Sequence, residues 1–224
     1  MKGRITMDFK EVFQKEHVTR KFTNRKVPEN AIAEIIKKAQ QSPSLLNSQP
    51  WRAYVLVGDP LEKFKQASIE NNDNDIKPDE DFASMLSLDW DVFPSRNMVT
   101  MGASQSFFFR NKLQLFSHAN KTMFNAPAII FLTVPKKSPA WSVFDLGIFA
   151  QSIMLLAINR GLGIMPAHSM VSYPDLVRKY AKIPEDEAVG MAIAIGYIDK
   201  NAEINDPKFI PARVPFDKIY KLTK

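Results

Sequence analysis

The chain has no cysteine, and only three histidines and eight glycines among its 224 residues. Without cysteine it can form no disulfide, no thiolate-ligated zinc site and no cysteine-held iron–sulfur cluster. The spacings of His17, His118 and His168 match no metal-binding signature, which disfavours a metal enzyme. A Rossmann glycine fingerprint is also missing, because residues 161–163 lack the third glycine and follow a predicted helix. Any nucleotide site must therefore be built in another way.

Long hydrophobic runs are missing too. The most apolar segment, residues 126–135, is about half as long as a bilayer-spanning helix. Residues 143–158 are longer but carry Asp145 and Gln151, and the start of the chain does not resemble a signal peptide. Hydrophobic residues make up 45% of the chain and charged residues 24%, which are ordinary values for a globular domain. We therefore expect one soluble, cytoplasmic domain over residues 1–224, with no membrane partner.

The net charge is +6, from 30 basic and 24 acidic residues. A basic balance suits nucleic acid, a membrane surface or an anionic ligand. The lysines, however, are scattered along predicted helices, as at Lys37 and Lys38, which favours a solvated surface. We expect no nucleic-acid partner, and a nucleic-acid-binding module stays as a rival that rests on the charge alone.

Helical and strand-like segments interleave without a regular βαβ series, which favours an α+β fold. Asp8 is a candidate N-cap for a helix over residues 8–17, and Pro28 suits the first turn of a second helix. Residues 71–95 form a polar excursion that is typical of a cover loop. The other predicted elements are strands at 54–57, 128–134 and 188–198, helices from Pro60, at 96–118, 143–159 (stopped by Gly161) and 173–180, and an extended tail at 201–224 with a short helix after Pro215.

One segment, residues 42–51, is crowded with hydrogen-bonding groups between a predicted helix and a predicted strand. Two prolines stiffen its backbone, and its hydroxyls and amides offer donors and acceptors. Such a set suits a planar heteroaromatic ligand with several edge acceptors. The alternative is a polar turn at a helix end, with Trp51 in the core. The hydrogen-bonding side chains are those of Ser42, Ser44, Asn47 and Gln49, and the two prolines are Pro43 and Pro50.

The same segment resembles the signature of the nitroreductase family, in which a helix ends in Ala/Ser-Pro-Ser and is followed by Asn and Gln-Pro-Trp. The resemblance implies a nitroreductase-like α+β fold, with a central, mainly antiparallel sheet flanked by helices. It also implies an intertwined homodimer that binds FMN, in which this loop reaches the flavin across the dimer interface and the tail at 201–224 wraps the partner subunit. The matching residues are Ser42, Pro43, Ser44, Asn47, Gln49, Pro50 and Trp51.

Two further segments are similar to the family motifs that hold the FMN phosphate and ribityl chain. Near the N-terminus, His17, Val18 and Arg20 lie at the positions of the opening motif, and Arg213 matches the closing one. An arginine suits this role because its planar fork binds phosphate oxygens in pairs. The chain departs from the family where Glu16 replaces a basic residue, Val18 a serine and Pro211 an often basic residue. These departures put the strength of phosphate binding in doubt.

The segment Pro166, Ala167, His168 and Ser169 corresponds to family backbone groups that lie against the flavin, with an N–H directed at N5. His168 has two interpretations, a general acid or a loop histidine whose partners are local. By analogy, Arg96 is the candidate for a positive charge near flavin N1 and O2. Asp145 near a helix start is expected to cap that helix.

The implied function is an FMN-dependent NAD(P)H oxidoreductase that reduces nitroaromatic or quinone-type acceptors by ping-pong hydride transfer through flavin N5. FMN and NAD(P)H would be the cofactors and a small aromatic molecule the substrate. We expect no metal and no catalytic side chain, because the flavin carries the redox step. The rivals are an FMN-binding sensor or storage protein and a different reductive reaction on the same fold.

Overall fold

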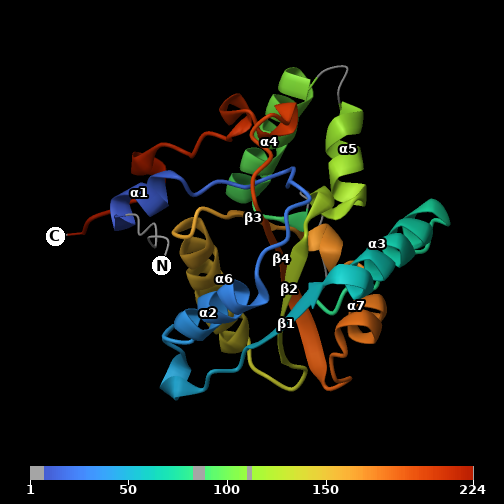
Figure 1. Ribbon diagram of the computed structural model, residues 1–224. Helices are drawn as coiled ribbons and strands as arrows, with labels where there is room; N and C mark the ends of the chain where they lie inside the picture. The colour runs from blue at the N-terminus through green and yellow to red at the C-terminus, as the bar shows by residue number, and fades with distance from the viewer. Residues whose placement is uncertain (1–7, 83–88, 110–112, 224) are drawn as a thin grey trace.

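A four-stranded sheet with only antiparallel pairings forms the centre of the protein (Figure 1). The computed structural model describes residues 8–82, 89–109 and 113–223. The two middle strands are almost fully buried, since they are continuous apolar runs with a packed layer on each face. The strand order is β1 (Arg52–Val57), β2 (Ala128–Pro135), β4 (Glu187–Gly196) and β3 (Gly163–Pro166).

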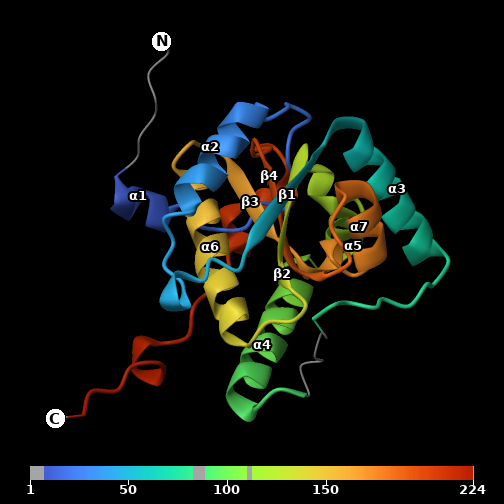
Figure 2. The same cartoon turned by 90° about the horizontal axis from the view of Figure 1, so that it is seen from below.

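Helices cover both faces of this sheet, as Figures 1 and 2 show from two directions. Alternate residues of β2 therefore enter different cores: Ile130 packs with the helices of one layer, and Phe131 with those of the other. In the second layer the ring of Phe64 meets Phe131 edge to face at 5.4 Å. The first layer holds α1 (Phe9–Gln14), α2 (Glu29–Ala39) and α6 (Trp141–Ile158), and the second holds α3 (Gly58–Asp73), α5 (Leu113–Lys121), α7 (Pro174–Ala181) and the buried end of α4 (Val92–Phe109).

Helix α6 is apolar over most of its surface. Its length and composition would suit a membrane span, yet 44% of it is buried inside the fold. Its first turns expose Trp141, Val143 and Phe144, with 58%, 45% and 59% of their surface accessible. The helix ends at Ile158 and is followed by Gly161, which has a φ of +72°. The N–H of Leu162 donates back to the carbonyl of Ala157, in the last turn of the helix, at 3.1 Å. An apolar helix that is buried on one side only indicates a further protein contact on the other.

The α+β prediction is confirmed, and the predicted strands lie within two residues of their observed bounds. The expected helix at 96–118 is wrong in its limits, since two helices, α4 and α5, cover this region and residues 110–112 between them lie outside the described residues. The segment between the two helices is shorter than the loop expected at 71–95, because α3 continues to Asp73 and α4 begins at Val92. Residues 83–88 of it also lie outside the described residues, and its role as a cover stays a prediction.

Two smaller features complete the comparison with the expected elements. Asp8 caps α1 as predicted, because its side chain accepts a hydrogen bond from the N–H of Lys10. The tail contains three single 3-10 turns: Glu203–Asn205, Pro207–Phe209 and, directly after Pro215 as predicted, Phe216–Lys218. The tail is therefore more structured than the extended segment expected from the sequence.

Candidate functional site

A cavity of about 270 Å³ opens where three distant parts of the chain meet: the segment after α1, strand β3 and the tail. We call it the Arg20 cavity. Five of the residues proposed from sequence line it, namely His17, Val18, Arg20, Pro166 and Arg213. The sequence offered no sign that Met154 of α6 and Ile210 would join them. The fold thus brings together both predicted phosphate-binding segments and the proline of the N5 segment.

Backbone pairing holds the first of these segments against β3. Val18 forms an isolated parallel bridge with Ile164, and the N–H of Thr19 donates to the carbonyl of Ile164 at 2.7 Å. This pairing adds a short extra strand to the edge of the sheet. It sets the direction in which the side chains on either side of Thr19 leave the backbone.

A single side chain, that of Asn205, ties the tail to the same segment. Its Oδ1 accepts from the N–H groups of Arg20 and Lys21 at 2.8 and 3.2 Å. Its Nδ2 donates to the carbonyls of Lys21 and Asp199 at 2.7 and 2.9 Å. Four hydrogen bonds from one amide are the most that Asn can make in this arrangement, so the side chain acts as a fixed brace. Sequence reasoning had assigned Asn205 no role.

Arg20 is the most unusual group in the cavity. The residue is only 6% exposed, and its Nε is buried without a hydrogen-bond partner. Its guanidinium carbon lies 5.6 Å from the centroid of the Phe116 ring, and no carboxylate among the described residues pairs with it. Burial lowers the pKa of Arg20. A buried cation without a counter-ion is unfavourable, so an anion that enters the cavity would gain its full attraction.

The acidic departure from the family pattern, Glu16, lines the cavity and is held in place by α6. Its Oε1 accepts a hydrogen bond from the Nε2 of Gln151 in α6 at 2.6 Å. Arg213, which also lines the cavity, is exposed and donates from Nη1 to the carbonyl of Pro211 at 3.1 Å. Arg20 and Arg213 thus supply two cations against one carboxylate in the lining.

The hydrogen bonds of the segment after β3 show which of its backbone N–H groups are available to a flavin. The N–H of Ala167 is taken up by the sheet, because it donates to the carbonyl of Ala192 at 3.1 Å. The N–H groups of His168 and Ser169, at the start of a 3-10 turn, make no hydrogen bond within the described part of the chain. The His168 side chain is half exposed, with its Nε2 3.7 Å from Oε1 of Glu80. The amides of His168 and Ser169 are therefore the ones open to a ligand.

The predicted ring-side loop, residues 42–51, has an unusual backbone. Leu46, Asn47 and Gln49 have positive φ values of 50°, 59° and 45°. Each such conformation of a non-glycine residue costs of order 1 kcal/mol and persists only where the surroundings impose it. Ser44 contributes locally, since its Oγ accepts from the N–H of Gln49 at 3.0 Å.

The expectation that Asp145 caps its own helix is wrong. The residue before α6, Ala140, makes no side-chain cap, and Asp145 lies inside the helix, 3% exposed. Its Oδ2 accepts from the N–H of Leu45 at 3.2 Å and from the hydroxyl of Ser48 at 3.4 Å. The carboxylate therefore supports the strained loop. Only the tertiary fold could reveal this, because the partners are about a hundred residues apart.

Three residues of α6, spaced at i, i+4 and i+7, hold this loop along one helix face. Asp145 is the first. Phe149 stacks on Trp51 with ring centroids 4.8 Å apart and 8° between the planes. The hydroxyls of Ser152 and Ser42 lie 2.7 Å apart. The loop is therefore built onto a rigid element, which is how proteins hold binding groups in a defined position.

The two halves of the predicted site are nevertheless apart within one chain. None of the loop residues lines the Arg20 cavity. On α6, Asp145, which supports the loop at Leu45, lies nine residues or about 13 Å of helix from Met154 in the cavity lining. Ser152, which contacts Ser42 at the start of the loop, lies two residues from Met154. Leu46 at the tip of the loop is 95% exposed. Arg96 lies on the exposed surface of α4 and does not line the Arg20 cavity. It is therefore not grouped with the predicted residues that line this cavity.

No group of three or more His, Cys, Asp or Glu side chains suited to a metal ion occurs within residues 8–82, 89–109 and 113–223. The candidate site is thus a basic cavity, two open backbone amides and a loop presented outward.

Comparison with known proteins shows which family and fold the chain shares. The chain is 25% identical over 210 residues to a 4-nitrobenzoate reductase of Pseudomonas putida, covering 90% of each sequence. It is 26% identical over 193 residues to nitroreductase NfnB of Mycolicibacterium smegmatis, covering 83% of this chain and 81% of that protein. The crystal structure of the FMN-dependent nitroreductase NfnB from Mycobacterium smegmatis in complex with NADPH has the same fold, with a TM-score of 0.86, 22% identity and coverage of 96% and 97%. The family model described as "Nitroreductase family" matches residues 16–197, and the chain belongs to that family.

Proposed function

We propose that this protein is an FMN-dependent NAD(P)H oxidoreductase that reduces small nitroaromatic or quinone-type acceptors by a ping-pong mechanism. The observation that carries the proposal is Arg20, a buried cation with an unpartnered Nε, facing a cavity lined by other residues of the expected phosphate site. Membership of the nitroreductase family, and relatives named as nitroreductases, support the same conclusion.

The residues of the cavity fit the phosphate end of FMN. Arg20 and Arg213 would bind phosphate oxygens, and His17 would donate a further hydrogen bond. Pro166 and Val18 would contribute walls without charge, and the cavity holds too few carboxylates to repel an anion. The carboxylate of Glu16 is held by the neutral amide of Gln151, so the lining keeps one acidic group beside its two arginines.

When bound, FMN would supply hydride transfer at N5 between NAD(P)H and the acceptor. The protein itself would bind the flavin, orient it and polarise its ring. The open amides of His168 and Ser169 would donate hydrogen bonds toward the ring. The loop with Ser42, Ser44 and Gln49 would present hydroxyl and amide groups to the ring of the partner's flavin.

We propose a homodimer, because no residue of the loop 42–51 lines the Arg20 cavity and the loop of a second copy would complete the site. Exposed apolar residues support this state. They include Phe13 of α1, Phe144 of α6 and, in the tail, Phe216, Ile219 and Tyr220. Large exposed apolar side chains are typical of surfaces that another protein covers. The tail at 201–224 would wrap the partner, and the dimer would work in the cytoplasm.

The deciding experiment is anaerobic spectroscopy of the purified protein. We expect a yellow protein whose flavin absorbance is bleached by NADH or NADPH and restored by 4-nitrobenzoate. A flavin that NAD(P)H fails to bleach would refute the reductase and favour a sensor or storage protein. A flavin that is bleached, but reoxidised by an enone or haloarene and not by nitro compounds, would assign a different reductive reaction. A protein without flavin would overturn the cofactor proposal.

A further inference from the structure

A polar cavity of about 460 Å³ opens in the second layer of the fold, between α3, α5 and the segment after β3. We call it the serine cavity, because four of the residues that line it are serines. Helices α3 and α5 lie side by side in this layer and form two of its walls (Figures 1 and 2). Its volume falls in the range of small-molecule sites, roughly 300 to 1,000 Å³.

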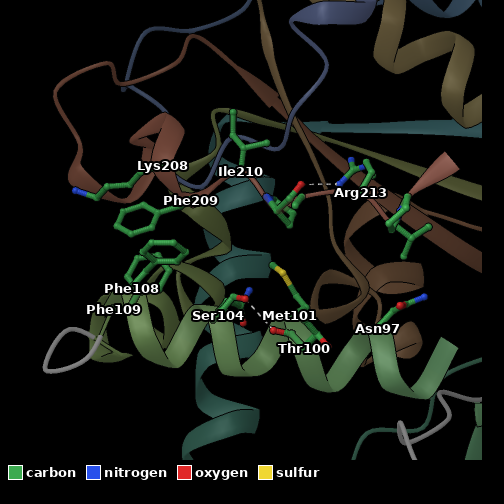
Figure 3. Close-up of a pocket in the computed structure, with 15 residues that line it drawn as sticks. Asn97, Thr100, Met101, Ser104, Phe108, Phe109, Lys208, Phe209, Ile210 and Arg213 are labelled. Carbon is green, nitrogen blue, oxygen red and sulfur yellow. Dashed lines mark hydrogen bonds between the residues drawn. The ribbon is translucent and has the colours of Figure 1, made fainter. Parts of the chain in front are cut away.

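The serine cavity is separate from the space around the proposed flavin site. A larger cavity, of about 530 Å³, lies between α4 and the tail (Figure 3), but it shares Ile210, Pro211 and Arg213 with the Arg20 cavity. That larger cavity is therefore not independent of the flavin site. The serine cavity shares no described lining residue with either of them, so an inference drawn from it goes beyond the proposed function.

The fold leaves the hydroxyl groups of this cavity without partners. Ser68 of α3 is the clearest case, because the residue is only 4% exposed and its hydroxyl makes no hydrogen bond within the described part of the chain. The hydroxyls of Ser117, Ser169 and Ser172 are likewise open among the described residues. Buried polar groups in proteins are normally hydrogen-bonded, and one that is not costs free energy. A ligand that bonds to Ser68 would remove that cost.

Two asparagines add oriented acceptors to the hydroxyls. The Nδ2 of Asn72 donates to the carbonyl of Ser68 at 2.8 Å, and the Nδ2 of Asn120 donates to the carbonyl of Phe116 at 3.0 Å. Each amide is thereby fixed to its own helix, and its Oδ1 accepts no hydrogen bond within residues 8–82, 89–109 and 113–223. Hydroxyls that both donate and accept, beside two fixed acceptors, suit a ligand that carries several hydroxyl groups of its own.

The cavity has little net charge. Lys121 is the one charged residue among the described residues that line it, and its Nζ is paired with the carboxylate of Asp73. An anion would have to compete with Asp73 for this lysine. Met123, which is buried, and Pro78 give apolar surface, and no aromatic ring lines the described part of the cavity. The lining therefore favours a neutral ligand that is neither anionic nor aromatic.

The walls of the cavity are held in fixed positions. Beside Pro78, the N–H of Asp79 donates to the carbonyl of Ser172 at 3.2 Å, and the hydroxyl of Tyr173 donates to the carbonyl of Ile76 at 3.1 Å. The ion pair of Lys121 with Asp73 joins α5 to α3. Small-molecule sites are usually formed before the ligand arrives, and this cavity meets that condition.

We infer that the serine cavity binds a small neutral polyhydroxylated molecule of about the size of a monosaccharide. Its hydroxyls would bond to the serines and to Oδ1 of Asn72 and Asn120, and its C–H groups would pack against Met123 and Pro78. Such a molecule supplies both the donors and the acceptors that the lining lacks, and it brings no charge into a cavity whose lysine is already paired.

The test uses residues that have no part in the proposed flavin site. Ser68→Ala removes the buried hydroxyl, and Ser106→Ala removes an exposed hydroxyl of α4 outside the cavity. Ser117→Trp introduces an indole that would occupy the cavity, and Gln114→Trp adds the same ring at an exposed position of α5 outside it. Because the hydroxyl of Ser68 has no partner among the described residues, Ser68→Ala should unfold at the same temperature as the wild type. Lost binding in this variant would then reflect the ligand and not the fold.

The probes are methyl β-D-xylopyranoside, a neutral sugar ring, and tetrahydropyran, the same ring without hydroxyls. Each is titrated into the isotope-labelled full-length protein, with and without added FMN, and followed by the NMR shifts of the backbone amides. We expect the sugar to cause saturable shifts at tens of millimolar, confined to amides around the serine cavity, and tetrahydropyran to cause none. Ser68→Ala should weaken binding about 2- to 10-fold, the effect of one neutral hydrogen bond, and Ser117→Trp should abolish it. Both controls should bind as the wild type does.

Several results would overturn the inference. They are the lack of saturable shifts with the sugar, equal shifts with tetrahydropyran, and equal weakening in a variant and its control. Tighter binding of inorganic phosphate at the same amides would also overturn it, because the cavity would then be an anion site around Lys121. Since the protein without FMN is titrated in parallel, a failure of the flavin proposal would appear separately, as a lack of flavin binding.

Discussion

The carboxylate of Asp145, buried in α6, accepts a hydrogen bond from the backbone N–H of Leu45, one hundred residues earlier in the chain. Leu45 stands directly before the turn in which Leu46, Asn47 and Gln49 adopt left-handed backbone conformations. The long helix therefore stabilises a strained loop that the chain would not adopt alone. A loop shaped at such a cost and then presented to solvent suggests a binding surface completed by another molecule.

Replacing Asp145 tests this support. Asp145→Leu leaves the N–H of Leu45 and the hydroxyl of Ser48 without their acceptor, so we expect the free energy of unfolding to fall by about 1–3 kcal/mol. Asp145→Asn keeps one oxygen and should cost less. If the loop meets the flavin, Asp145→Leu should also raise the dissociation constant of FMN, measured by flavin fluorescence. The control is Ser142→Ala, buried on the same helix with its hydroxyl bonded to Pro139 and Ser138. Equal FMN affinity in the two variants would contradict a contact between the loop and the flavin.

Arg20 should discriminate between two flavins. Arg20→Gln removes the buried cation, so we expect FMN to bind about 10- to 100-fold more weakly, as the loss of a charge-assisted hydrogen bond to phosphate implies. Riboflavin, which lacks the phosphate, should bind as it does to the wild type. Since the guanidinium pairs with no carboxylate among residues 8–82, 89–109 and 113–223, the variant should unfold no more easily in urea. Arg25→Gln is the control, because Arg25 lies over the ring of Tyr197, outside the Arg20 cavity. An equal loss for both flavins would contradict a phosphate role.

The exposed apolar face of α6 should control the oligomeric state. Phe144→Glu introduces a charge into a surface that we expect to be covered in the dimer, so the variant should elute as a monomer in light-scattering chromatography. Ile76→Glu is the matched control, because Ile76 is similarly exposed (50%) but follows α3 on the far side of the molecule (Figures 1 and 2). A monomeric wild type, or dissociation of both variants, would refute this assignment of the interface.

Tyr54 should make the fold sensitive to alkaline pH. Burial and the hydrogen bond to the nearly buried Glu187, at 2.9 Å, raise the pKa of Tyr54 to about 12 from its usual 10. The contribution is complete below pH 10, where both folded and unfolded chains hold the proton, and it is lost as the pH rises from 10 to 12. We expect the free energy of unfolding to fall over this interval and to fall less steeply in Tyr54→Phe. Identical pH profiles for the two proteins would show that Tyr54 does not contribute.

The local elements were largely predictable because their causes are local. A continuous β-prone apolar run predicts the strand Ala128–Pro135. Gly161 marks the end of α6, because glycine adopts a positive φ more readily than other residues do. Strand β3 was missed for an equally local reason. It is four residues long and ends in Pro166, and a proline argues against a strand when only the sequence is considered. Its pairing with β4 is what makes it a strand.

What the sequence determined by itself was therefore the α+β class, most elements and the family, along with the residue types of a flavin site. The tertiary structure decided where those residues lie. It joined His17, Arg20 and Arg213 in one cavity, kept the loop of residues 42–51 apart from them, and turned Asp145 from an expected helix cap into the support of that loop. Periodicity and turn chemistry act over a few neighbouring residues and can be read from them. The choice of a partner about a hundred residues away depends on how helices and sheet pack, and no local pattern encodes it.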